Sequence, residues 1–192
     1  MGRQTSDHVS QVKRIQSGAS NAASDSASVG AEGEWLPIHE GEYGSQYDHR
    51  YATYEANSVR AVTLTEHCNP EFEPRFELVA SAKEYESIVG GWADMAAPCL
   101  LAFRRVSNSG NDRTSICTLL PRMPCTYGWI IVTGCNSQAQ ALLCANFNSL
   151  VFDYLLRSNL SQPSIPQSTF QQMPTPPRRG TLNRISLSSC LR

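Results

Sequence analysis

The longest uninterrupted helical pattern in this chain covers residues 136–160, NSQAQALLCANFNSLVFDYLLRSNL. No Gly or Pro interrupts it, and its apolar residues recur at the three- and four-residue spacing of an amphipathic helix. Asn136 or Ser137 fits the N-cap, and Arg157 lies near the carboxyl end, where the helix dipole favours a cation. The pattern predicts one helix of about six turns that packs on a core through Ala139, Leu142, Leu143, Ala145, Phe147, Leu150, Val151, Tyr154 and Leu155.

Three apolar stretches ahead of this helix are typical of strands, and they cover residues 98–106, 114–120 and 127–133. The polar loop SNSGNDR, at residues 107–113, predicts that the first two strands form a long hairpin. Residues 76–80 predict another strand, and residues 81–89 a short helix that Ser81 and Glu84 begin as a capping box. We therefore expect an α+β domain in which a small mixed or antiparallel sheet packs on one long helix.

The two ends of the chain differ in composition from its middle. Residues 1–33 are rich in Ser, Ala, Gly and Asp without periodic apolar residues, which predicts a disordered leader. Residues 161–177 form a polar segment with five prolines, and residues 178–192 are expected to be an unstructured tail. The ordered domain is thus expected to cover residues 34–177, and no apolar run in it approaches the about 20 residues that span a membrane.

The seven cysteines are odd in number and show no CxxC spacing. Cys99, Cys117 and Cys144 lie in apolar stretches, so we interpret them as small core residues of a protein in the reducing cytoplasm. The pattern predicts neither a disulfide framework nor a metal site.

A net charge of -1 hides an asymmetry between the two halves. Residues 1–86 hold seven basic and fourteen acidic side chains, whereas residues 87–192 hold nine basic side chains, all Arg, and three acidic ones. Arginine suits bidentate contacts with phosphate and with guanine. The asymmetry therefore predicts an anionic partner for the second half of the chain.

The predicted hairpin loop and its flanks concentrate side chains that read nucleic acids. Arg and Asn are the side chains that best recognise guanine and adenine edges in the major groove. The alternative interpretation of the same residues is a solvated hairpin tip. The candidate residues are Arg104, Arg105, Asn108, Asn111, Arg113 and Thr114.

A second polar cluster, Asp48, His49 and Arg50, stands within an aromatic segment. Acid–base chemistry is one interpretation of these residue types. Adjacent residues rarely point at one target, so a local hydrogen-bonded turn is the favoured interpretation. No candidate nucleophile or general base emerges elsewhere, and no catalytic residue is assigned.

Four segments, in order, resemble the C-terminal specificity region of large adenine-specific DNA methyltransferases of the type IIG restriction-modification and phage-defence kind. WLPIHEGEYGSQYDHRYATYE resembles a Leu-Pro-hydrophobic opening with a Phe/Tyr-Asp-His-Arg core. CLLAFRRVSNSGNDRTSICTLLPR resembles a strand–loop–strand with an Asn and an Arg-Thr. ALLCANFNSLVFDYLLRSNL resembles the helix with Asn-Ser and Phe-Asp-Tyr, and STFQQMPTPP the Leu-Pro-hydrophobic-Pro tail. The resemblance covers residues 35–177 and departs from the family at residues 161–164, SQPS, where a Gly-Gly-Thr-like turn is common.

The resemblance implies that this domain grips duplex DNA and sets which adenine is presented for flipping. Arg50, Arg104, Arg105 and Arg113 would contact phosphate or bases, and Asn108, Asn111 and Thr114 would contact base edges or sugars. The alternative, from another class, is a protein–protein interaction module that docks on a partner, such as a catalytic methyltransferase subunit, through the helix face and the aromatic segment.

The family's catalytic half, which binds S-adenosylmethionine and carries Asn-Pro-Pro-aromatic, has no counterpart in this sequence. The nearest match, Asn69-Pro70-Glu71-Phe72, has Glu71 in place of the second proline, and no Gly-rich cofactor loop precedes it. We therefore expect a truncated or split gene product that binds DNA, has no cofactor and does not methylate DNA by itself.

Overall fold

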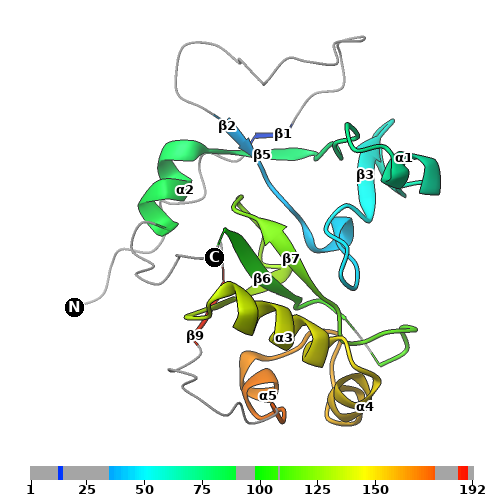
Figure 1. The fold of residues 1–192 in the computed structure, drawn as a ribbon, viewed down its shortest axis with the longest axis vertical. Helices are drawn as coiled ribbons and strands as arrows, with labels where there is room; N and C mark the ends of the chain where they lie inside the picture. Colours follow the sequence, from blue (N-terminus) through cyan, green and yellow to red (C-terminus); the bar gives the residue numbers. More distant parts are fainter. Residues whose placement is uncertain (1–12, 15–34, 90–97, 108, 176–185, 190–192) are drawn as a thin grey trace.

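The computed structural model describes residues 13–14, 35–89, 98–107, 109–175 and 186–189. It shows an α+β fold of small antiparallel sheets and short helices (Figure 1). In Figure 1 the helices α3, α4 and α5 lie below a four-stranded sheet, and a three-stranded sheet lies above it. The elements are β1 (Lys13–Arg14), β2 (Trp35–Pro37), the 3-10 helix η1 (Gly41–Tyr43), β3 (Ala52–Glu55), β4 (Ser58–Ala61), α1 (Leu64–Cys68), β5 (Leu78–Ser81), α2 (Ala82–Val89), β6 (Cys99–Arg104), β7 (Cys117–Pro121), β8 (Trp129–Thr133), α3 (Ser137–Phe147), α4 (Leu150–Ser158), α5 (Gln167–Gln171) and β9 (Ser186–Ser189).

The four-stranded sheet has the strand order β7-β6-β8-β9, with every neighbouring pair antiparallel. The register of the β6–β7 pair places Leu100 opposite Leu120, which confirms the predicted hairpin. The three-stranded sheet has the order β1-β5-β2, and β3 and β4 form a separate hairpin. The α+β class is confirmed.

Both faces of β6 are buried, which explains why its sequence is a continuous apolar run. Leu101 and Phe103 point toward α3, α4 and α5, where Phe103 contacts the rings of Phe147, Phe152 and Phe170. The alternate side chains of the sheet form a second cluster on the opposite face. This second cluster consists of Leu100, Ala102, Leu120, Cys125, Trp129 and Ile131.

The prediction of one helix over residues 136–160 is wrong, because α3 and α4 are separate helices. Asn148 is the C-cap of α3, and its side chain bonds both the N–H and the C=O of Cys117, at 2.9 and 2.7 Å. Ser149 then begins α4 as an extended N-cap, and its hydroxyl accepts from the Phe152 N–H at 3.2 Å. The predicted N-cap of α3 is correct, since Asn136 accepts from the Ala139 N–H.

The break changes which side chains are buried. Leu150, Val151 and Tyr154, predicted to face the core, are 73%, 70% and 69% exposed. Phe152 and Leu156 are buried instead. The predicted apolar face therefore holds in α3 for Ala139, Leu143 and Phe147, whereas Leu142 and Ala145 are exposed.

The strand after the hairpin loop begins later than predicted. β7 starts at Cys117, and of residues 114–116 only Ile116 bonds to β6, where its carbonyl accepts from the Arg104 N–H at 2.8 Å. The reason is that the N–H groups of Thr114 and Ser115 both donate to the carboxylate of Asp153 on α4. A side chain thus replaces the neighbouring strand as their partner.

Two short strands lie within the segments predicted to lack structure. Lys13 and Arg14 form β1, paired with Val79 and Leu78 of β5. Ser186–Ser189 forms β9, paired with β8. The rest of the predicted leader and tail lies outside the described residues. Among the described residues, no helix is long and apolar enough to cross a membrane.

Candidate functional site

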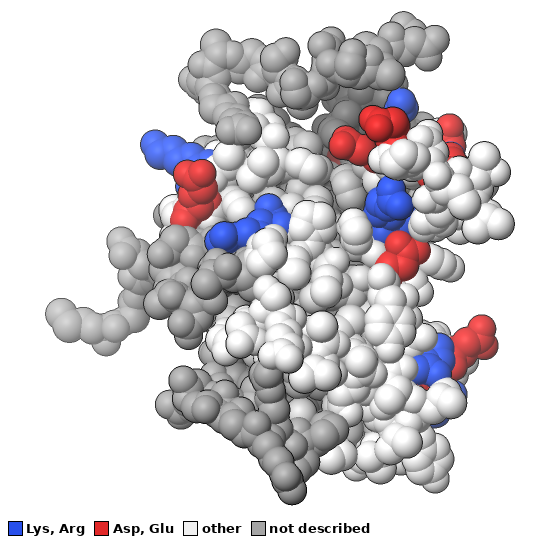
Figure 2. All heavy atoms as spheres, viewed as in Figure 1, with Lys and Arg blue, Asp and Glu red and all other residues white. Residues whose placement is uncertain are grey.

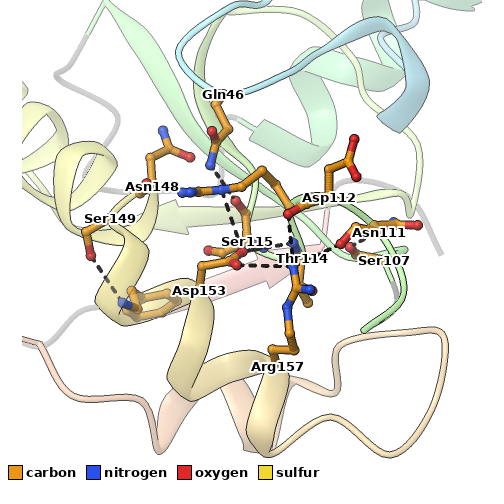
Figure 3. A network of polar contacts seen from close by, with 12 residues as sticks. Gln46, Ser107, Asn111, Asp112, Thr114, Ser115, Asn148, Ser149, Asp153 and Arg157 are labelled. Atoms are coloured by element: carbon orange, nitrogen blue, oxygen red, sulfur yellow. Dashed lines mark hydrogen bonds and ion pairs between the residues drawn. The ribbon is translucent and has the colours of Figure 1, made fainter.

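The predicted hairpin loop between β6 and β7 is fixed by a carboxylate from α4. Asp153 is 6% exposed, and its Oδ1 accepts from the N–H groups of Thr114 and Ser115 at 2.8 and 2.7 Å (Figure 3). Two arginines approach the same carboxylate: Arg157 Nη2 lies 3.4 Å from Oδ2, and Arg113 Nε lies 3.9 Å from Oδ1. One side chain therefore sets the backbone at the end of the loop and orients two cations.

The two arginines also bind backbone carbonyls. Arg157 Nη2 donates to the carbonyls of Asn111 and Asp112 at 2.9 and 3.0 Å. Arg113 Nη2 donates to the carbonyl of Asn148 at 2.6 Å. Arg157 thus ties the tip of the loop to α4, and Arg113 ties its end to the break between α3 and α4.

The segment after β2 adds further hydrogen bonds to the same stretch, residues 115–117. Gln46 Nε2 donates to the Ser115 carbonyl at 2.9 Å, and the Tyr47 N–H donates to the Cys117 carbonyl at 3.0 Å. The Ser115 hydroxyl donates to the Phe147 carbonyl, the last residue of α3. We call Asp153, Arg113, Arg157, Thr114, Ser115 and Asn148 the Asp153 network. It joins elements that are far apart in the sequence.

The structure brings Asn111, Arg113 and Thr114 together in this region, as the sequence predicted. It also shows that they serve the fold. Thr114 is fully buried, so a DNA contact from its side chain would require the loop to open. Arg113 has a side chain only 26% exposed and is oriented by α4, whereas Asn111 is exposed and donates to the Ser107 hydroxyl at 3.3 Å.

The other candidates lie apart from the loop tip. Arg104 ends β6, and Arg105 follows it with its backbone bonded to Gly128 and Ile165. Burial lowers the pKa of Arg104, an effect that nearby Glu42 and Tyr51 oppose. Arg50 donates to the carbonyls of Phe72 and His67, at 3.2 and 3.4 Å, and so holds the loop around α1. Asn108 lies outside the described residues.

The turn predicted at residues 48–50 is present. Asp48 Oδ1 accepts from the Arg50 N–H at 2.8 Å, and the Ser45 N–H donates to the Asp48 carbonyl at 2.7 Å. The other carboxylate oxygen of Asp48 lies 3.5 Å from His67 Nε2. Asp48 and Arg50 are therefore engaged in fixing this loop.

Asp153 and Asn148, which organise the loop, were not predicted from the sequence. A signal was present for Asp153: it is the single acidic residue in an otherwise apolar and uncharged helical stretch ahead of Arg157. A lone carboxylate there is expected to have a partner, because burying an unpaired charge is costly. Asn148 gave a weaker signal as one of several uncharged polar residues in the stretch.

A buried histidine, also missed, connects the aromatic segment to the sheet. His39 is fully buried, and its ring lies 5.4 Å from that of Phe76 and 5.7 Å from that of Trp129. Its Nε2 donates to the His49 carbonyl at 2.9 Å, and its Nδ1 accepts from Trp129 Nε1 at 3.1 Å. Gly44 leaves room for this pair, because a Cβ there would lie 2.7 Å from the Trp129 ring.

We expect the folded protein to lose stability as the pH falls below about 6.5. Burial lowers the pKa of His39 from its usual value of 6.5, so the unfolded chain takes up the proton first. Each such group can remove at most about 1.4 kcal/mol per pH unit. His39→Gln can keep both hydrogen bonds without titrating, so its free energy of unfolding should fall less between pH 7 and pH 5 in urea titrations.

The control is His67→Gln, which changes a partly exposed histidine. Equal pH dependence in the wild-type protein and His39→Gln would contradict the assignment of a neutral, buried His39.

The chemistry of the site is that of a fixed loop with a few exposed polar groups. No group of three His, Cys, Asp or Glu side chains within the described ranges could hold a metal ion. On the face shown in Figure 2, Lys and Arg occur in small groups, several of them beside Asp or Glu, and much of the described surface is uncharged. Binding through this face would therefore depend on individual arginines rather than on one broad basic field.

Comparison of the chain with models of protein families, with curated proteins and with solved structures finds no match.

Proposed function

We propose that this chain is the DNA-recognition part of a site-specific adenine-N6 DNA methyltransferase of the restriction-modification or phage-defence kind. It binds duplex DNA through the β6–β7 hairpin and presents the target to a catalytic half. S-adenosylmethionine and the methyl-transfer chemistry belong to that catalytic half.

The observation that carries the proposal is that the four segments of the family resemblance meet at one hairpin. The aromatic segment reaches β7 through Tyr47, and the helical segment reaches it through Asn148. The fourth segment, residues 168–177, reaches β6 through Phe170, whose ring lies 4.4 Å from that of Phe103. Segments far apart in the sequence thus contact the strands of the same hairpin, as expected of one recognition unit.

The Asp153 network supports a role in recognition because it fixes the loop before any partner binds. A pre-organised loop loses less conformational entropy on binding than a mobile one. Asn111 at the exposed tip of the loop and Arg105 at its base remain partly accessible. The side chain of Arg113 is partly exposed, and Asp153 on α4 orients it. We therefore assign phosphate contacts to the arginines and a base-edge contact to Asn111.

We expect Arg113→Ala to weaken duplex binding, and one of Arg104→Ala and Arg105→Ala to do so as well, because neighbouring residues at a strand end point to opposite sides. Each lost phosphate contact should flatten the slope of log affinity against log salt by about one unit. The measurement is fluorescence anisotropy with a labelled duplex between 50 and 200 mM salt.

Arg60→Ala is the matched control, since Arg60 is ion-paired with Glu55 and Glu66 at a distance from the hairpin in sequence and sheet. Affinity that responds equally to Arg60→Ala and to the hairpin variants would contradict a specific contact. Circular dichroism on each variant separates loss of contact from loss of folding.

A second candidate function has its own observation. Leu150, Val151 and Tyr154 are strongly exposed on α4, and such a patch suits docking on a partner protein, such as a catalytic methyltransferase subunit. The salt dependence of binding distinguishes the two candidate functions, because phosphate contacts make the affinity for DNA fall steeply as the salt concentration rises. If the chain fails to bind duplex DNA even at low salt, the docking function is favoured.

A further inference from the structure

The large aromatic side chains that are exposed in the described ranges are all tyrosines, and three of the four lie on segments connected to the end of β6. Tyr47 is 62% exposed, Tyr51 45% and Tyr127 62%. The fourth, Tyr154, lies on α4. Tyrosines exposed to this extent contribute little to the stability of the core. Their rings are therefore available for binding at the surface.

Each of the three tyrosines is connected to the end of β6. The Tyr47 N–H donates to the carbonyl of Cys117, which is the ladder partner of Phe103. Tyr51 lies within electrostatic reach of the Arg104 guanidinium. Tyr127 precedes Gly128, whose carbonyl accepts from the Arg105 N–H at 2.8 Å. We call Tyr47, Tyr51 and Tyr127, together with Arg104, the tyrosine surface.

The backbone of Tyr47 is strained. Its φ is 62°, in the left-handed region that Gly and Asn adopt more readily than an aromatic residue. The Cys117 carbonyl and the Ser45–Asp48 turn hold this conformation. Because the side chain is exposed, burial of the ring does not compensate for the strain, and a strained residue of this kind points to a functional position.

We propose that the tyrosine surface binds unpaired DNA bases by stacking, while Arg104 contacts the adjoining phosphate. Tyrosine rings stack on any base, and neighbouring cations follow the backbone, which is the combination that single-strand-binding proteins use. Arginine can also lie over aromatic rings and bases. The inference rests on the proposed function and deepens it, because it adds the recognition of unpaired bases to that of duplex DNA.

Glu42 is an acidic group near Arg104 that opposes this binding. It lies within electrostatic reach of Arg104 and is exposed. Its negative charge would repel a phosphate held by that arginine. Glu42→Gln should therefore tighten the binding of DNA at the tyrosine surface, most clearly at low salt.

The test compares three labelled probes by fluorescence anisotropy: a 20-nucleotide oligothymidine, a 20-base-pair duplex, and the same duplex with a central bulge of three unpaired bases. Tyr47→Asn removes the ring and suits the left-handed backbone, so this variant should fold. We expect Tyr47→Asn and Tyr127→Ala to weaken binding of the bulged duplex by roughly tenfold each, and Tyr47→Phe to bind as the wild-type protein does.

Tyr154→Ala is the control, because it removes an equally exposed tyrosine from a different surface. If the bulged and perfect duplexes bind equally, and the tyrosine variants bind as the wild type does, the inference is overturned while the proposed function stands. If only the oligothymidine binds, with the same dependence on Tyr47, the stacking surface is supported and duplex recognition is overturned. If no probe binds at 50 mM salt, both are overturned.

Discussion

Phe152→Asp is expected to leave little folded protein. Phe152 is 2% exposed, and its ring lies 5.0 Å from that of Phe147 and 6.2 Å from that of Phe170. Removal of a buried Phe costs about 3–5 kcal/mol, and burial of an unpaired carboxylate adds several more. The total approaches the about 5–15 kcal/mol that stabilises a typical domain. Urea unfolding followed by circular dichroism measures the loss.

The neighbouring substitution, Val151→Asp, is the matched control. Val151 is 70% exposed, so the same change one residue away should alter the free energy of unfolding by no more than about 0.5 kcal/mol. The pair also tests the break between α3 and α4, since one continuous helix would place Val151 on the buried face and Phe152 away from its centre. A larger loss from Val151→Asp than from Phe152→Asp would support the continuous helix.

Asp153→Ala is expected to cost about 3–5 kcal/mol. The substitution leaves the N–H groups of Thr114 and Ser115 buried without their acceptor, and it removes the carboxylate beside Arg113 and Arg157. An unpaired buried donor alone costs about 1–3 kcal/mol. Asp153→Asn keeps an oxygen that can accept both bonds, so it should lose less stability than Asp153→Ala in the same urea titration.

Asp112→Ala is the control for this network, because Asp112 is an exposed acidic residue of the same loop whose backbone carbonyl, and not its side chain, accepts from Arg157. Its free energy of unfolding should stay near that of the wild-type protein. Equal, small losses from Asp153→Ala and Asp112→Ala would show that the carboxylate of Asp153 does not hold the loop.

Several features followed from local sequence because the interactions that determine them are local. The N-cap at Asn136 needs only a side-chain acceptor two or three residues ahead of a free N–H. The turn at residues 48–50 is made by Asp48 bonding two residues onward. The antiparallel hairpin of β6 and β7 follows from two apolar runs joined by a polar loop, and the α+β class follows from these elements together.

The surroundings of the candidate DNA-binding residues could be predicted less well from the sequence. Arg113 and Thr114 were correctly placed beside a loop, but their local sequence does not show that α4 supplies a carboxylate to the Thr114 N–H and beside the Arg113 side chain. The loop composition is equally compatible with a solvated tip and with a fixed one. The choice between these depends on Asp153, which is 39 residues away along the chain from Thr114.

The end of α3 at Asn148 shows most clearly what local sequence can and cannot determine. The local sequence from Ser137 to Leu160 contains no residue that must stop a helix, so periodicity alone predicts continuity. α3 ends at Asn148, whose amide satisfies both backbone groups of Cys117 at once, and the extended Ser149 then caps α4. Local sequence thus determined which residues can form helices, strands and turns. Only the tertiary structure decided where the helix ends and which side chains face inward, because unpaired polar groups of β7 needed a partner that folding brought to them.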